Sequence, residues 1–150
     1  MRESKTEMTV LVTPEMSNFG GKMHGGELLK LLDQVAYTCA MRYCGNYVVT
    51  LSVDNVLFKQ SIAIGEMVTC KAAINYTGRT SMEVGIQVVA ENLSAGTVRH
   101  TNSSYFTMVS VDTDGKPVLV NPYEPTSDLD KRRWLDAEKR KEYRKKISAT

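Results

Sequence analysis

The alternation of apolar and polar residues predicts an initial strand, one long helix, four further strands and a charged terminal helix. Residues 6–13 are rich in β-branched side chains and end at Pro14, which is typical of a strand. A helical repeat of apolar residues then covers about 26–44 and stops at Gly45. Alternating runs predict four long strands joined by short turns, over 47–58, 67–77, 80–91 and 98–111.

This order of elements predicts an α+β fold, because one helix is followed by consecutive strands. Strands with short connections favour an antiparallel meander, which can wrap its concave face around the single helix. Pro122 and Pro125 indicate a linker, and residues 128–146 predict a highly charged helix. We therefore expect one domain over residues 1–122, with a linker and a basic helical tail over 123–150.

The charge of the chain is unevenly distributed. The net charge is +2, but residues 128–150 hold nine Lys/Arg and five acidic residues, so the tail is basic and the body faintly acidic. A basic tail can attract nucleic acid, anionic lipid or a polyphosphate ligand. A solvated helix is the simpler interpretation, and no aromatic or glycine interleaving supports nucleic-acid binding. No nucleic-acid partner is expected.

Neither a membrane span nor a disulfide framework is indicated. No apolar run approaches the roughly 18 residues of a membrane span, and the first eight residues lack the apolar core of a secretion signal. The three cysteines, Cys39, Cys44 and Cys70, are odd in number and have no CxxC spacing. Free thiols fit a reducing compartment, so a cytoplasmic location is expected.

The most informative chemistry lies around the start of the long helix. Glycine pairs at 20–21 and 25–26 leave backbone N–H groups unshielded at the positive end of the helix, where a negatively charged oxygen binds well. Asp33 follows on the same helix. With residues placed about 100° apart, Asp33 lies at the edge of an apolar arc, where partial desolvation should resist its ionisation. That arc contains Leu28, Leu29, Leu32, Ala36, Cys39, Ala40 and Tyr43.

Two other interpretations stay open for this segment. Considered alone, Asp33 could be an exposed aspartate that pairs weakly with Lys30. The glycine loop before it favours a role in an active site instead. His24, beside the second glycine pair, would serve as a general base, a loop hydrogen-bond donor or a helix-entry contact. Serine-nucleophile elbows, P-loops and GxGxxG sequences do not occur, and the cysteines lack the setting of a nucleophile.

Residues 18–33, from Asn18 to Asp33, look like the signature of hotdog-fold acyl-CoA thioesterases, closest to the brain-type and bacterial acyl-CoA hydrolase group. Residues 52–68 resemble the second stretch of that group and residues 78–84 its third. The likeness spans about residues 6–120. The chain departs from the pattern at His24, where many relatives have phenylalanine, and at Lys22, where brain-type members have asparagine.

The resemblance implies a helix wrapped by an antiparallel sheet, two such units joined edge to edge, and active sites between subunits, often with three dimers in a hexamer. It implies hydrolysis of acyl-CoA to fatty acid and coenzyme A. Asp33 would activate water or attack the thioester, with the carbonyl oxygen held by the Gly26 amide first and the Gly25 amide as a second donor. Asn18 and His24 complete the expected catalytic set. No metal, and no cofactor beyond the coenzyme A of the substrate, is expected.

Substrate contacts are expected from two further places. Arg79, Thr80 and Ser81 are candidates for the pantetheine and phosphate end of coenzyme A, although Arg79 in a turn is also an ordinary solvated residue. Phe58 is a candidate for closing the acyl pocket. The competing functions are a non-catalytic acyl-CoA sensor, which gains little from an acid beside the thioester, and a hotdog dehydratase, which needs a histidine and a carboxylate together.

Overall fold

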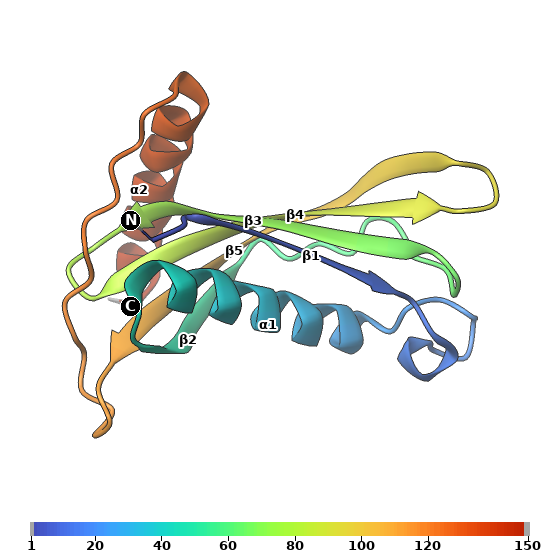
Figure 1. The fold of residues 1–150 in the computed structure, drawn as a ribbon, viewed down its shortest axis with the longest axis horizontal. Helices are drawn as coiled ribbons and strands as arrows, with labels where there is room; N and C mark the ends of the chain where they lie inside the picture. The colour runs from blue at the N-terminus through green and yellow to red at the C-terminus, as the bar shows by residue number, and fades with distance from the viewer. Residues whose placement is uncertain (1, 149–150) are drawn as a thin grey trace.

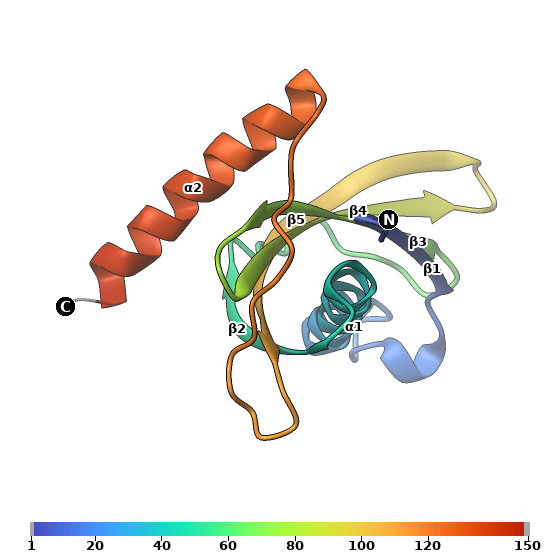
Figure 2. The ribbon, with the colours of Figure 1, turned by 60° about the vertical axis from the view of Figure 1, so that its left-hand side comes forward.

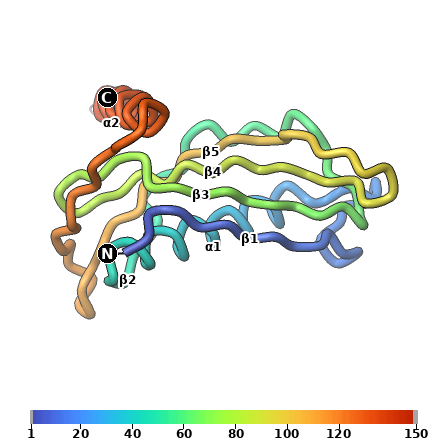
Figure 3. Tube along the Cα trace, turned by 45° about the horizontal axis from the view of Figure 1, so that its top comes forward, coloured from blue at the N-terminus to red at the C-terminus, as the bar shows by residue number. Residues whose placement is uncertain are grey.

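The structure is a computed structural model that describes residues 2–148. Its five strands form one antiparallel sheet in the order β1-β3-β4-β5-β2. Strands β1, β3, β4 and β5 lie in that order in Figure 3. The sheet curves around α1, and α2 crosses the opposite face (Figures 1 and 2). The elements are β1 (Lys5–Leu11), a 3₁₀ turn (Pro14–Met16), α1 (Gly25–Cys44), β2 (Tyr47–Asp54), β3 (Met67–Thr77), β4 (Ser81–Asn92), β5 (Thr97–Val111) and α2 (Asp128–Ser148).

The core forms where α1 lies in the curve of the sheet. Alternate residues of β3, β4 and β5 face the helix, and many of them, such as Val68, Val84 and Phe106, are fully buried. Leu32 and Ala36 of α1 pack against this inner face. Burying one helix stripe and one sheet face together removes most apolar surface from water. The predicted α+β hotdog arrangement is confirmed.

The prediction for α1 was right in extent and for six of the seven residues of the apolar arc, but its edge was misplaced. The helix ends where expected, at Gly45, whose φ of 77° is the left-handed conformation that favours glycine. Leu31 and Val35 are buried, whereas Leu29 is exposed. The sheet covers the side of the helix that holds Leu31 and Val35, and Asp33 faces only its edge strand, β2. The protomer by itself therefore leaves Asp33 exposed and does not supply the expected desolvation.

Strand β2 is shorter and less regular than the alternation predicts. It ends at Asp54, because Asn55 has a φ of 59° and turns the chain away from the sheet. A bulge between Thr50 and Ser52 shifts its pairing with β5, so Val49 and Val53 do not share a face as predicted. β2 is an edge strand with four apolar residues between 39 and 68% exposed, namely Tyr47, Val49, Leu51 and Val53. An apolar open edge is a ready surface for a second chain.

The basic helix α2 is held against the outer face of the sheet. Its Trp134 ring packs on Tyr76 with centroids 4.4 Å apart. Arg140 donates two hydrogen bonds, of 2.7 and 2.8 Å, to the buried carboxylate of Glu83. Asn75 donates to the same carboxylate at 3.0 Å. The tail therefore packs on the body as a structural element. The proposed domain boundary between residues 122 and 123 stays a prediction.

Candidate active site

Asp33 is joined to strand β2 through a threonine that the sequence did not single out. The Thr50 hydroxyl donates to Asp33 Oδ1 at 2.5 Å and also lies 3.5 Å from the Met108 sulfur. A hydroxyl has one proton, and the shorter bond to a charged oxygen takes it. None of residues 2–148 donates to the second Asp33 oxygen. The pair thus fixes one oxygen and leaves the other open to a water molecule.

A shallow groove of about 480 Å³ lies between α1 and β2 around this pair. Tyr37 and Tyr47 close one side, with an edge-to-face contact between rings 6.1 Å apart. Met108 of the neighbouring strand also lines the groove. The groove therefore combines aromatic and apolar side chains with polar ones, including Gln34 and Thr38 beside the Asp33–Thr50 pair, and it is bordered by the open edge of β2.

At the start of α1, the glycine N–H that is free among the described residues to bind a ligand is that of Gly25, whereas Gly26 was the expected first donor. His24 is the N-cap of α1, and its Nδ1 accepts the Gly26 N–H at 3.0 Å. This bond makes His24 a helix-entry contact, one of its three predicted roles, and occupies the donor expected to bind substrate. Gly25 N–H has no such bond within the described chain. Phe58, found in a loop rather than a strand, lies beside Gly25.

Asn18 organises the glycine loop before the helix. Its Oδ1 accepts the N–H groups of Gly20 at 2.9 Å and Lys22 at 3.2 Å, closing a tight turn. His24 N–H in turn donates to the Met16 carbonyl at 2.7 Å. These bonds hold the loop against the start of α1. The side-chain nitrogen of Asn18, Nδ2, has no hydrogen-bond partner within residues 2–148.

The predicted coenzyme A contacts lie at the other end of the molecule. Arg79 is exposed in the β3–β4 turn, and its carbonyl and that of Thr80 accept from Val120 and Ser110 at 2.8 and 2.9 Å. Ser81 begins β4 beside them. Figure 1 places this turn near the C-terminal end of α1, away from the glycine loop.

One protomer does not assemble the predicted site. Asp33 follows Gly26 by seven residues, which is about 10 Å along a helix axis. The two groups are therefore separated by about two turns of the helix. The glycine loop with Asn18, His24, Gly25 and Phe58 forms one cluster, Asp33 with Thr50 a second, and Arg79, Thr80 and Ser81 a third. Within residues 2–148 of one protomer these three clusters stay apart.

The buried cysteines are poor nucleophiles, as the sequence suggested. Burial raises the pKa of the Cys39 thiol to about 11 and that of Cys70 to about 12, so both stay protonated at neutral pH. Within residues 2–148, no three side chains of histidine, cysteine, aspartate or glutamate gather as a metal site would require. In the same range no helix combines the length and apolar character needed to cross a membrane.

Thr50 was missed because its signal is three-dimensional. It occupies a polar position in an alternating run, where threonine is an ordinary strand residue. Only the packing of α1 against β2 brings its hydroxyl to Asp33, 17 residues earlier in the chain.

Relatives with known structures share this architecture throughout. A crystal structure of an apo-hexameric acyl-CoA thioesterase is 41% identical, with a TM-score of 0.92 over 97% of this chain and 93% of that one. The acyl-CoA hydrolase of Staphylococcus aureus, solved with butyryl coenzyme A, coenzyme A and coenzyme A disulfide, is 33% identical, with a TM-score of 0.90 over 98% and 90%. Variants of that hydrolase with one asparagine, one aspartate or one threonine replaced by alanine have also been solved.

Sequence comparison agrees with the structural likeness. Protein VdlD of Helicobacter pylori is 52% identical over 141 residues, which are 94% of this chain and 80% of that protein. Residues 20–97 match the model of the thioesterase superfamily, and this range contains the glycine pairs, Asp33 and Thr50. The chain therefore belongs to the thioesterase superfamily, among its hotdog-fold acyl-CoA thioesterases.

Proposed function

We propose that this protein hydrolyses acyl-CoA thioesters to a free acid and coenzyme A, with Asp33 as the base that activates water. The carrying observation is the 2.5 Å bond from Thr50 to Asp33 Oδ1, on the wall of a groove that also contains Tyr37, Tyr47 and Met108. A carboxylate oriented through one oxygen presents the other in a fixed direction. General-base assistance of this kind is worth about 10²–10⁴-fold in rate.

Spacing supports the same residues. In the Staphylococcus aureus hydrolase, the asparagine, aspartate and threonine replaced in the solved variants are separated by 15 and then 17 residues. Asn18, Asp33 and Thr50 have the same separations in this chain. The match supports Asn18 as part of the site and adds Thr50, which the structure alone had linked to Asp33.

The helix start of one subunit and Asp33 of another would share one substrate. The thioester carbonyl oxygen accepts from Gly25 N–H, the amide that His24 leaves available. The second Asp33 oxygen takes a proton from water as the water oxygen bonds to the carbonyl carbon. The carbonyl re-forms as the carbon–sulfur bond breaks, coenzyme A leaves as a thiolate, and the proton held by Asp33 passes to that thiolate or to solvent. A thiol pKa near 8.5 makes coenzyme A an adequate leaving group without prior protonation.

The exposed edge of β2 is the surface on which this sharing depends. Its apolar residues flank the groove and end near the Asp33–Thr50 pair. Pairing two chains along this edge would extend the sheet and bury that surface. A trimer of such dimers is proposed because a relative of 41% identity is described as hexameric. Arg79, Thr80 and Ser81 are proposed to meet the coenzyme A end of the substrate, and Phe58 its acyl end.

A proline substitution tests the helix amide without breaking the helix. Gly25 is the first helical residue, where proline is well tolerated, and His24 has the extended backbone that precedes proline, with φ −66° and ψ 134°. Gly25→Pro removes the N–H and adds a ring, and loss of the N–H should lower the rate of acyl-CoA hydrolysis about 10²–10³-fold. Gly25→Ala keeps the N–H, and its Cβ would lie an ordinary 3.6 Å from the Phe58 ring.

Mixing variants then tests the sharing of sites. Gly25→Pro and Asp33→Asn proteins are each expected to be nearly inactive. After joint unfolding and refolding, about a quarter of the sites of a random two-fold assembly pair an intact helix start with an intact aspartate. Activity should recover to that extent, measured as thiol release from acyl-CoA esters ranging from acetyl to palmitoyl. No recovery, with assembly shown by light scattering, would place both groups in one chain and overturn the shared site.

A further inference from the structure

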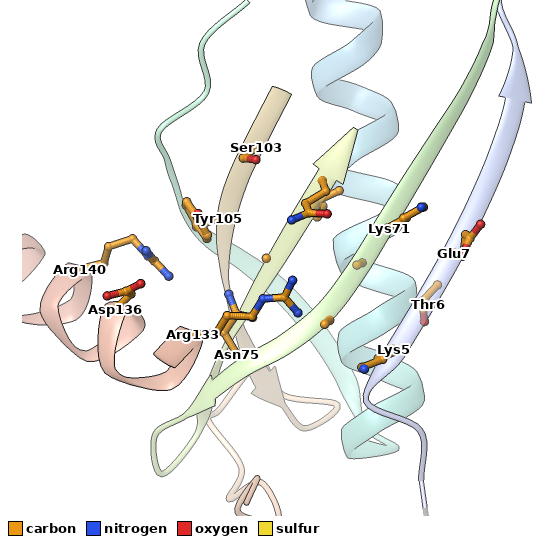
Figure 4. Close-up of a pocket in the computed structure, with 15 residues that line it drawn as sticks. Lys5, Thr6, Glu7, Lys71, Asn75, Ser103, Tyr105, Arg133, Asp136 and Arg140 are labelled. Carbon is orange, nitrogen blue, oxygen red and sulfur yellow. The ribbon is translucent and has the colours of Figure 1, made fainter. Parts of the chain in front are cut away.

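The outer face of the sheet holds a second hollow, on the side opposite α1 (Figure 4). It has a volume of about 410 Å³ and lies between the strands and α2. Strand register gives its shape, because Ala73 is directly opposite Gly85 at the centre of one cross-strand row. Lys5 and Tyr105 stand at the two ends of that row. Two small residues between two large ones leave a depression in the sheet.

The floor of this hollow is fixed by a glycine that nothing larger could replace. A Cβ built on Gly85 would lie 2.4 Å from the Asn75 side-chain nitrogen, closer than real side chains approach. Asn75 uses this space to donate to Glu83 at 3.0 Å. Glu83 also binds Arg140 of α2, so the floor and the helix wall belong to one hydrogen-bonded network. The hollow is therefore a preformed feature of the fold.

Positive charge gathers around the hollow. Its lining contains four cations, Lys5, Lys71, Arg133 and Arg140, and two carboxylates, Glu7 and Asp136. Only Arg140 is neutralised by an ion pair, with Glu83 beneath it. Within residues 2–148, no carboxylate oxygen lies within 4.0 Å of the charged nitrogens of the other three cations. Figure 4 shows Arg133 and Arg140 entering from α2, with Lys5 and Lys71 on the far side of the floor.

The remaining lining side chains suit a polar organic body. Asn75, Gln87 and Ser103 offer neutral hydrogen-bonding groups around the small-residue floor. The volume falls in the range of about 300–1,000 Å³ found for small-molecule sites, and a lone inorganic phosphate would leave most of it empty. Arginine and lysine are the side chains that bind phosphate most strongly. We propose that this hollow binds a phosphorylated metabolite, with its phosphate held by Arg133, Lys5 and Lys71.

Calorimetric titration of the full chain tests the proposal, with ADP, glucose 6-phosphate and inorganic phosphate as probes. At least one organic phosphate should bind once per chain with a Kd below about 1 mM, and more tightly than inorganic phosphate. Arg133→Gln combined with Lys71→Gln should weaken that binding at least about tenfold, because each removes a charged hydrogen bond. Arg132→Gln combined with Lys139→Gln removes equal charge from exposed positions of α2 that do not line the hollow, and should change it less than about twofold.

A variant that fills the hollow without changing its charge distinguishes binding in the hollow from general electrostatic attraction to the basic helix α2. Ala73→Leu fills the floor without changing charge and should weaken binding about as much as the double charge variant. Thermal unfolding of each variant shows whether the fold is retained. The proposal is overturned if no organic phosphate binds, if Ala73→Leu binds as the unmodified chain does, or if the matched control loses as much affinity as the lining variant. Because binding is measured without turnover, this outcome is independent of the proposed hydrolysis.

Discussion

Glu66, at the end of the loop between β2 and β3, and Asp33, on α1 beside β2, are carboxylates that differ in exposure and in the number of hydrogen bonds they accept. Glu66 is 7% exposed, and both its oxygens are occupied, by Arg99 at 2.5 and 2.9 Å and by the Ala63 N–H at 2.8 Å. Asp33 is exposed and receives a single described hydrogen bond, from Thr50. A saturated carboxylate stabilises a fold, whereas one with a free oxygen on a groove wall can accept a proton.

The comparison also concerns what each carboxylate is attached to. Arg99 of β5 donates to the Ser61 carbonyl as well as to Glu66. The Arg99–Glu66 ion pair therefore holds the loop between β2 and β3 against β5. Asp33 and Thr50 link α1 to the edge strand, beside an open apolar surface. Removing the first pair should loosen the protomer, and removing the second should stop chemistry without loosening it.

The largest effect is expected from Asp33→Asn. The amide keeps the size of the side chain and can still meet Thr50, but it cannot take a proton from water. Hydrolysis of acyl-CoA should fall by at least about two orders of magnitude, with the midpoint of thermal unfolding nearly unchanged. The matched control is Glu27→Gln, one acid replaced on the first turn of the same helix. Turnover close to that of the unmodified protein would remove Asp33 from the mechanism.

The next effect, on stability and its pH dependence, is expected from Glu66→Gln. Hydrogen bonds to charged groups contribute about 1.5–3 kcal/mol, so the free energy of unfolding should drop by about that amount at pH 7. Hydrogen bonding to Arg99 lowers the pKa of Glu66 in the folded chain. Its stabilisation is therefore complete above the ordinary glutamate pKa of 4.5 and is lost as pH falls through the lowered value.

Urea unfolding at several pH values measures this. The difference between the unmodified chain and Glu66→Gln should be largest at neutral pH and should shrink below about pH 4.5. Glu124→Gln, at an exposed linker position, is the control and should show no such trend. A difference that stays constant down to acid pH would mean that the ion pair is not its source. Turnover per folded molecule should be unaffected, in contrast to Asp33→Asn.

The fold was predictable from sequence to a large extent, and the site only in part. Local patterns carry helix and strand identity, so β3 was predicted at the residues where it occurs and Gly45 as the end of α1. Most of the predicted buried arc of α1 was right, but its edge was wrong because that edge depends on how the sheet curves. Leu31 and Val35 look no more apolar in sequence than Leu29. The bulge in β2 is likewise set by its pairing with β5.

Site residues were predictable where they are close in sequence. The glycine loop and Asp33 lie within 16 residues, and their order alone indicated oxyanion binding and an acid. The bond from His24 to Gly26 required the rotamer of one side chain, which no spacing reveals. Thr50 required the contact between α1 and β2. The hollow beneath α2 required four strands in register and a helix across them.

The smallest effect, and the one that tests the comparison most directly, is expected from Thr50→Val. Valine keeps the shape of threonine and removes the hydroxyl that orients Asp33. Because the aspartate itself remains, only its alignment is lost, and kcat should fall about tenfold with KM nearly unchanged. Thr50→Ser keeps the hydroxyl and should restore most of the rate. Thr69→Val removes a hydroxyl bonded to Thr9 on the outer face and should leave kcat as it is.

If Thr50→Val changes KM rather than kcat, Thr50 contacts substrate instead of positioning Asp33. The difference between the two carboxylates would then rest on exposure alone, since the single bond to Asp33 would have no catalytic consequence.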